Sequence, residues 1–117
     1  PSDAYAKAKM DEWLFWEQYS HEPYVAVCRY MMRYLGKPAS DLDPDKVKRG
    51  HAALARMEQQ LTGTPFLVGE RASLADVALL AYTRVAHEGG FDLGRYPAIS
   101  AWLKRVAAQP GHIRITD

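Results

Sequence analysis

The chain has 117 residues, of which 48% are hydrophobic and 25% are charged. This length suits one domain, and the composition provides both a buried core and a charged surface, which argues against intrinsic disorder. The 15 basic and 14 acidic side chains leave a formal net charge of +1. The balance gives no reason to expect nucleic acid or a membrane surface as a partner, and the apolar runs are too short to span a bilayer.

Cysteine and histidine are too sparse for a disulfide framework or a metal site. Cys28 is the only cysteine, which favours a reducing, cytoplasmic compartment, and its apolar neighbours predict a buried, inert thiol. His51, His87 and His112 lie far apart in the sequence. They lack the i, i+4 spacing of helical metal ligands, so we expect no metal. Because the chain begins at Pro1 without an initiating methionine, we expect it to be a trimmed or processed piece.

The first predicted helical segment covers residues 3–35 and ends at Gly36-Lys37-Pro38. Pro23 removes a backbone donor within it, so the helix is expected to kink or divide there. Two apolar stripes follow its length, and the second contains Trp13, Trp16, Tyr24, Val27, Met31 and Tyr34. A helix with one packed face shows one stripe, so this helix is expected to have a partner beyond its own bundle.

A second helix is predicted from Asp43-Pro44 to about Thr62, because an aspartate cap followed by proline is typical of a helix start. Its inward positions are predicted to be Val47, Leu54, Met57 and Leu61. Gly50 lies in its middle, where glycine costs about 1 kcal/mol relative to alanine. A close helix crossing at Gly50 is one compensation that we expect.

Residues 66–69 are expected to form an apolar plug over the bundle, since four residues cannot form a sheet alone. A third helix is predicted from Ser73 to about His87, and residues 77–81 are apolar on every side, which indicates the central helix of the core. A fourth helix is predicted from Pro97 to Ala108, followed by a tail over residues 112–117. Its inward residues are predicted to be Ile99, Trp102, Leu103 and Val106.

Ser73 and Asp76 have the spacing of a capping box at the start of the third helix. The Ser73 hydroxyl is expected to accept a hydrogen bond from the Asp76 N–H, and the Asp76 carboxylate from the Ser73 N–H. The pair therefore has a structural role. The residue before the box is the small Ala72, so its apolar contact with Val77 is expected to be weak.

Three stretches resemble the C-terminal domain of bacterial glutathione transferases, in the order and spacing of that family. Residues 66–78 read FLVGERASLADVA and resemble the start of its central helix. Residues 96–106, YPAISAWLKRV, with Gln109-Pro110, resemble its next helix and the end of that helix. Residues 13–24, WLFWEQYSHEPY, resemble its first long helix. The resemblance covers nearly the whole chain and implies an all-α bundle of four main helices, the first long and kinked.

The resemblance also implies what this chain lacks. Residues 1–117 are expected to be the helical domain alone, without the thioredoxin-like N-terminal domain that binds glutathione and supplies the residue that stabilises its thiolate. No catalytic residue is assigned here, and the chain by itself is expected to be inactive. The full-length protein is expected to be a homodimeric detoxification enzyme that uses glutathione against a small apolar electrophile. This chain would line the pocket for that electrophile and contribute to the dimer interface.

Within the first helix, the resemblance places the substrate-binding candidates at Trp13, Trp16, Glu17, His21 and Tyr24. Tyr19 and Ser20 lie in the same stretch. Core packing is the preferred interpretation for Trp13, whereas core packing and pocket lining are equally favoured for Trp16. His21 is expected either to line the pocket or, preferably, to bond a carbonyl freed near Pro23.

A second class of function remains open. Helical domains of this kind also occur in translation factors and aminoacyl-tRNA synthetases, where they mediate assembly without catalysis. In those proteins the helical domain usually carries basic extensions, whereas here only seven residues, with no basic tail, follow Pro110. The transferase hypothesis is therefore preferred. A stress-type homologue with little activity is a third possibility.

Overall fold

The computed structural model describes residues 3–109. This part of the chain is helical, with an isolated antiparallel bridge between Phe66 and Gly69 and no strand. The predicted all-α class is confirmed. The main helices are α1 (Ala4–Trp16), α2 (Glu22–Arg33), α3 (Pro44–Gly63), α4 (Leu74–Thr83) and α5 (Pro97–Ala107). Short helical turns join them, at Ala39–Asp41, Ala86–Gly89 and Leu93–Arg95.

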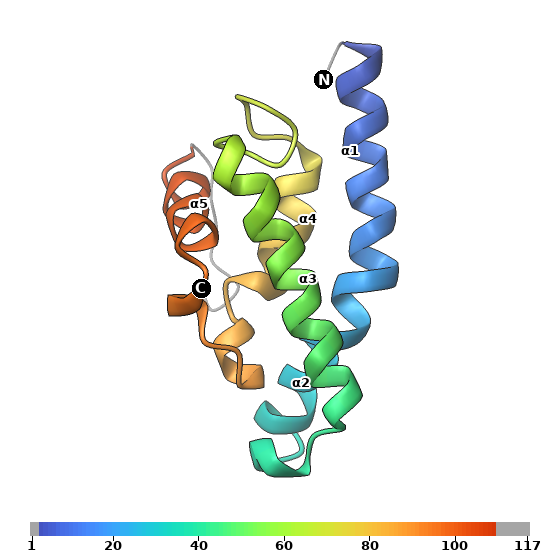
Figure 1. Ribbon diagram of the computed structural model, residues 1–117, viewed down its shortest axis with the longest axis vertical. Helices are drawn as coiled ribbons and strands as arrows, with labels where there is room; N and C mark the ends of the chain where they lie inside the picture. Colours follow the sequence, from blue (N-terminus) through green and yellow to red (C-terminus); the bar gives the residue numbers. More distant parts are fainter. Residues whose placement is uncertain (1–2, 110–117) are drawn as a thin grey trace.

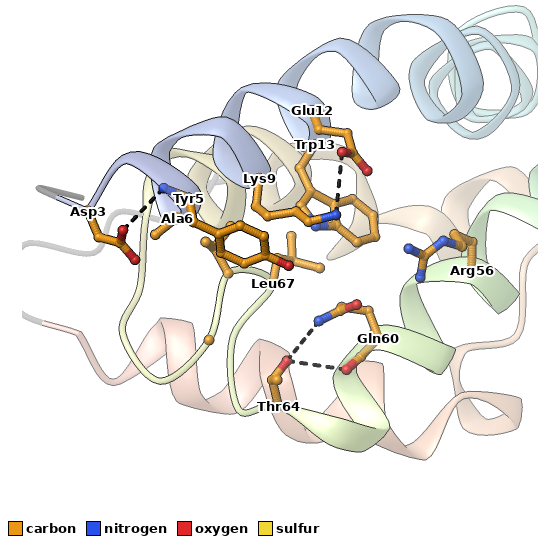
Figure 2. Close-up of a pocket in the computed structure, with 12 residues that line it drawn as sticks. Asp3, Tyr5, Ala6, Lys9, Glu12, Trp13, Arg56, Gln60, Thr64 and Leu67 are labelled. Atoms are coloured by element: carbon orange, nitrogen blue, oxygen red, sulfur yellow. Dashed lines mark hydrogen bonds and ion pairs between the residues drawn. The ribbon is translucent and has the colours of Figure 1, made fainter.

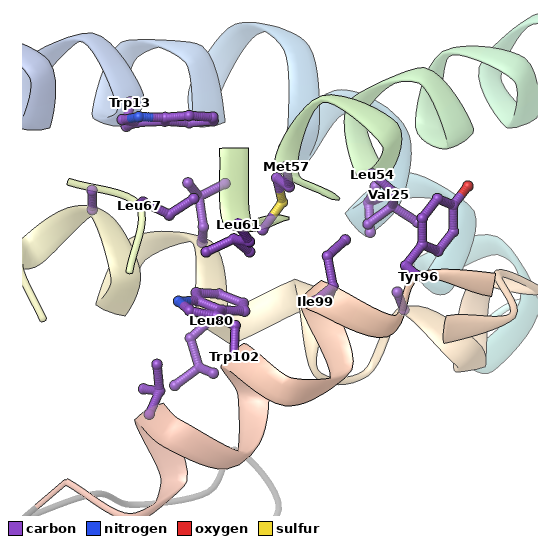
Figure 3. Close-up of a cluster of buried hydrophobic side chains, with 14 of the residues drawn as sticks. Trp13, Val25, Leu54, Met57, Leu61, Leu67, Leu80, Tyr96, Ile99 and Trp102 are labelled. Carbon is purple, nitrogen blue, oxygen red and sulfur yellow. The ribbon is translucent and has the colours of Figure 1, made fainter. Parts of the chain in front are cut away.

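The helices form an elongated bundle in which α1 and α3 run in opposite directions along the long axis (Figure 1). The most extensive packing joins α2 to the turn Ala86–Gly89, and among the main helices α1 packs on α4, α3 on α5, and α2 on α3. The core lies between these packed helices, and the loop over residues 66–69 covers it, as predicted. Its fully buried side chains include Leu79 and Phe91, and also Val25, Leu54, Met57, Leu67, Ile99 and Trp102 (Figure 3).

The long first helix is divided by a π-helical turn, Glu17–His21, that separates α1 from α2. In this turn the Glu22 N–H donates to the Glu17 carbonyl, five residues back. Pro23 follows directly and has no N–H to donate, so the regular α-helical pattern cannot pass through this point. The predicted division is confirmed, and the wider turn changes the direction of the chain between α1 and α2.

The predicted central helix is shorter and less buried than expected. α4 ends at Thr83, and His87 belongs to the separate turn Ala86–Gly89. Leu74 and Val77 are 62% and 60% exposed, so the prediction of burial on every side was wrong. The bundle covers only the side of α4 that carries residues such as Ala75, Leu79 and Leu80, and the outer apolar stripe is left bare.

The capping box at the start of α4 is confirmed. Asp76 Oδ2 accepts from the Ser73 N–H at 2.8 Å, while the Ser73 hydroxyl also accepts from the Ala75 N–H at 3.2 Å. Asp76 is fully buried, and its other oxygen accepts from the Leu67 N–H at 3.0 Å and the Trp102 indole N–H at 2.7 Å. One carboxylate thus joins α4, the 66–69 loop and α5.

Gly50 makes room for a ring rather than for a helix crossing, contrary to expectation. A Cβ at Gly50 would collide with Phe91 Cζ. The close backbone approach occurs instead at Gly89, where a Cβ would lie 2.8 Å from the Arg29 backbone nitrogen. There the turn Ala86–Gly89 crosses α2, and the Arg29 guanidinium pairs with Glu88 at 2.8 Å.

Candidate functional site

Two adjoining grooves lie along α3, the first facing α1 and the second facing the stretch from Trp16 to Tyr24. The larger, here called the Trp13 groove, has a volume of about 480 Å³. Each helix lines it at successive turns, since residues four apart share a helix face. α1 supplies Tyr5, Lys9 and Trp13, and α3 supplies Arg56 and Gln60; Thr64 follows directly after α3, and Leu67 lies at the base (Figure 2).

Trp13 forms part of this groove although only 6% of its surface is exposed. The Arg56 guanidinium covers its indole at 4.9 Å from the ring centroid, and Trp16 packs edge-on at 5.1 Å. The burial of Trp13 therefore agrees with core packing, which was the preferred interpretation. One face of its ring borders the groove beneath Arg56. A guanidinium stacked in this way keeps its N–H donors at its edge, available to a further partner.

The second groove, the Tyr24 groove, has a volume of about 290 Å³ and continues past Arg56. It is lined by Trp16, Tyr19, Ser20, Tyr24, Arg49, Ala52, Ala53 and Arg56. The Tyr24 hydroxyl accepts from Arg49 Nη1 at 3.2 Å, and Lys46 and Arg49 lie over its ring at 5.9 and 5.7 Å. Tyr19 is 85% exposed. The groove therefore combines exposed aromatic surface with positive charge.

His21 is buried inside the bundle rather than in either groove. Its Nε2 lies 2.8 Å from Thr83 Oγ1, and the Thr83 hydroxyl donates to the sulfur of Met57 at 3.8 Å. Thr83 thereby accepts from His21 Nε2–H, which leaves Nδ1 as a buried acceptor with no described partner. The preferred bond to a carbonyl near Pro23 is not formed. Burial lowers the pKa of His21 to about 4, so the ring is neutral at pH 7.

Glu17 lies in the same π-helical turn and is 5% exposed. Its carboxylate accepts from Gln18 Nε2 at 2.7 Å. Burial, more than the nearby charge of Glu22, raises the pKa of Glu17. Like His21, it lies outside both grooves, so the structure separates the five substrate-binding candidates into Trp13 in the first groove, Trp16 and Tyr24 in the second, and two interior residues.

Sequence reasoning missed the α3 wall of both grooves, above all Arg49 and Arg56. Arg49 and Ala53, and likewise Arg56 and Gln60, have the i, i+4 spacing of one helix face, but the sequence does not say which helix lies opposite.

Cys28 is buried as predicted, and burial raises the pKa of its thiol, so it stays protonated at neutral pH. Within residues 3–109, no cluster of three His, Cys, Asp or Glu side chains is placed to hold a metal.

Comparisons with known proteins agree with this architecture. Residues 23–110 match the family model described as glutathione S-transferase, C-terminal domain. A crystal structure of a glutathione S-transferase from Pseudomonas fluorescens [Pf-5] superposes with a TM-score of 0.95 at 50% identity, covering 100% of this chain and 59% of that one. A glutathione S-transferase from Xanthobacter autotrophicus py2 gives 0.92 at 50% identity, covering 98% and 57%.

Among curated proteins, Disulfide-bond oxidoreductase YfcG of Escherichia coli is 25% identical over 103 residues, covering 85% of this chain and 46% of the relative. The all-helical bundle thus matches the family model over residues 23–110. The chain belongs to the glutathione S-transferase C-terminal domain family. It spans about half the length of the curated relatives it matches. Among residues 3–109, no helix is long and apolar enough to cross a membrane.

Proposed function

We propose that this chain is the helical second domain of a cytoplasmic glutathione transferase, in which it shapes the site for an apolar electrophile and takes part in a homodimer. The observation that carries the proposal is the 50% identity to the Pseudomonas fluorescens glutathione S-transferase over the whole chain. A first, thioredoxin-like domain would bind glutathione. The chain alone would lack the group that stabilises the thiolate, and so would not catalyse the reaction.

Bare apolar surface supports a partner domain. Leu74 and Val77 leave an exposed apolar stripe on α4, and Phe15 on α1 is 76% exposed. Large exposed apolar side chains that gather on a fold usually contact another surface. We assign the α4 stripe to the first domain of the same subunit.

The Tyr24 groove supports the role of the first helix in binding the electrophile or the second subunit. Trp16 and Tyr24 supply apolar ring surface with a few polar groups, as small-molecule sites do. Trp13 would act at the rim of the adjoining groove. Glu17 and His21 would act indirectly, by holding the π-helical turn that sets the direction of Trp16 and Tyr24.

The test is an assay of the native full-length protein with glutathione. Two electrophiles are compared, 1-chloro-2,4-dinitrobenzene for conjugation and a mixed disulfide for reduction, since one relative is named a disulfide-bond oxidoreductase. Turnover of either by the full-length protein, with none by the 117-residue chain, is expected. A full-length protein that binds no glutathione and turns over neither would instead support the non-catalytic interaction module.

A Tyr24→Leu variant of the full-length protein tests the groove itself. If the groove holds the electrophile, KM for the electrophile should rise several-fold while the affinity for glutathione stays unchanged. Thr62→Ala is the matched control, because Thr62 lies on α3 outside both grooves and is exposed. An equal change in both variants would contradict the assignment.

A further inference from the structure

A group of exposed side chains lies where α2 ends, outside both grooves. It consists of Tyr30, Arg33, Tyr34 and Leu35, here called the α2 patch, and the side chain of each is more than half exposed. None of the four lines either groove. Single exposed apolar side chains are ordinary on a protein surface, but three large ones within six residues form a patch that suits a partner.

The α2 patch lies far from the surface that we assign to a first domain. α1 begins at one end of the long axis, and α2 ends toward the other (Figure 1). α4, which carries the bare apolar stripe, begins toward the end that holds the N-terminus (Figure 1). The proposed arrangement of domains therefore leaves the α2 patch uncovered.

The aromatic rings of the α2 patch are held in place by their neighbours. The rings of Tyr30 and Tyr34 lie 5.9 Å apart between centroids. The guanidinium groups of Arg29 and Arg33 lie 5.4 and 5.9 Å from the Tyr34 centroid. Ordered aromatic side chains lose little conformational entropy when a partner covers them. Tyrosine and arginine also dominate the binding energy of many protein interfaces.

The α2 patch carries a surplus of positive charge. Arg29 Nε donates to Glu88 Oε1 at 2.8 Å, whereas Arg33 Nε lies 3.9 Å from Oε2, beyond hydrogen-bonding distance. One carboxylate thus faces two guanidinium groups, and the surplus falls on Arg33, the more exposed of the two. Lys37 adds nothing to it, because it shares a small cavity with Asp41. A carboxylate from outside could accept two parallel N–H groups from Arg33.

This charge distinguishes between the partners that such a surface could take. A second copy docked by two-fold symmetry would bring Arg33 toward its own counterpart, and like charges oppose that contact. Nucleic acid needs many cations, whereas the patch offers one and the chain has a net charge of +1. An acidic segment that also carries an apolar side chain satisfies both the charge and the rings.

We propose that the α2 patch docks an acidic segment of another protein, with a carboxylate on Arg33 and an aromatic or aliphatic side chain against Tyr30 and Tyr34. The inference goes beyond the proposed function, because it needs neither glutathione nor the grooves. The contact is small and exposed, so binding is expected to be weak and sensitive to salt.

The probes are the fluorescein-labelled peptide GEDFEDLEG and its neutral counterpart GQNFQNLQG, titrated with the native full-length protein by fluorescence anisotropy. The acidic peptide is expected to bind more tightly than the neutral one. Arg33→Gln should weaken binding of the acidic peptide by about three- to tenfold and leave that of the neutral peptide unchanged. Tyr34→Ser should weaken binding of both peptides, because it removes ring surface that each of them covers.

Lys104→Gln is the matched control, because Lys104 is exposed on α5 and removing it changes the net charge equally. It should bind both peptides as the wild type does. An acidic peptide that does not bind, or that binds Arg33→Gln as tightly as the wild type, would overturn the proposal. An equal loss in Lys104→Gln would also overturn it, because that result reports net charge rather than a site.

Sedimentation of the wild type and Arg33→Gln tests the second copy as the occupant. Equal oligomeric states are expected. A self-association that Arg33→Gln alters would overturn the proposal in favour of a second copy on this face. The inference and the proposed function fail separately, since a protein that turns over no electrophile can still bind the acidic peptide, and an active transferase can fail to bind it.

Discussion

Replacing Asp76 by alanine removes the acceptor of four donors at once. Two belong to the helix start, where Oδ2 accepts from the Ser73 N–H and hydroxyl at 2.8 and 3.3 Å. The other two bring distant segments together, where Oδ1 accepts from the Leu67 N–H and the Trp102 indole. Because Asp76 is fully buried, water cannot replace it for these two donors.

The magnitude follows from this arrangement. Loss of a helix cap costs about 1 kcal/mol, and each buried donor left without an acceptor costs about 1–3 kcal/mol. Asp76→Ala is therefore expected to lower the free energy of unfolding by about 3–7 kcal/mol, a large share of the roughly 5–15 kcal/mol of a typical domain. A capping box alone would account for only about 1 kcal/mol.

Urea unfolding followed by circular dichroism measures this difference. Asp43→Ala is the matched control, because Asp43 caps α3 by accepting from the Asp45 N–H at 3.0 Å but is exposed, so it should lose only about 1 kcal/mol. Asp76→Asn keeps an acceptor for Leu67 and Trp102 and should lie between the two alanine variants, which preserves the test if Asp76→Ala does not fold. Equal losses in Asp43→Ala and Asp76→Ala would refute the reasoning.

Three further predictions concern the interior. Burial lowers the pKa of His21 to about 4, so protons bind preferentially to the unfolded chain, and the free energy of unfolding should fall by about 3 kcal/mol from pH 7 to pH 4. Urea titrations across that range should show a smaller loss of unfolding free energy for His21→Asn than for the wild type. An equal dependence on pH in the two proteins would count against the assignment. Gly50→Ala should destabilise by about 1–3 kcal/mol, because its Cβ would meet the Phe91 ring, whereas Gly63→Ala, with open space, should not. Glu58→Ala should cost about 2 kcal/mol in a thermal melt, since both its oxygens cap α5; an unchanged melt would contradict this.

The features that the sequence predicted are those that local spacing determines. The capping box of Ser73 and Asp76 spans three residues, and the division before Pro23 depends on one missing N–H, so each was visible in a short stretch. The apolar positions of α3 and α5 follow the helical period, and most are buried as expected, with Leu54 and Trp102 fully covered. Val47 and Leu103 are only half-buried.

The features that the sequence could not predict depend on which segments meet. The bonds from Trp102 to Asp76 and from the α5 backbone to Glu58 join residues 26 and 40 or 41 positions apart. Arg56 reaches Trp13 only because α3 runs antiparallel to α1 in one register. The exposure of Val77 was missed for a related reason, since an apolar stripe looks the same whether the bundle or another domain covers it.

The central claim is that this helical chain works beside a glutathione-binding domain. The most direct test is the mass of the native protein in its source cells, measured by immunoblot with an antibody raised against this chain. A band well above 13.2 kDa that glutathione resin retains is predicted. A band at 13.2 kDa would contradict the claim and would mean that the helical domain acts alone.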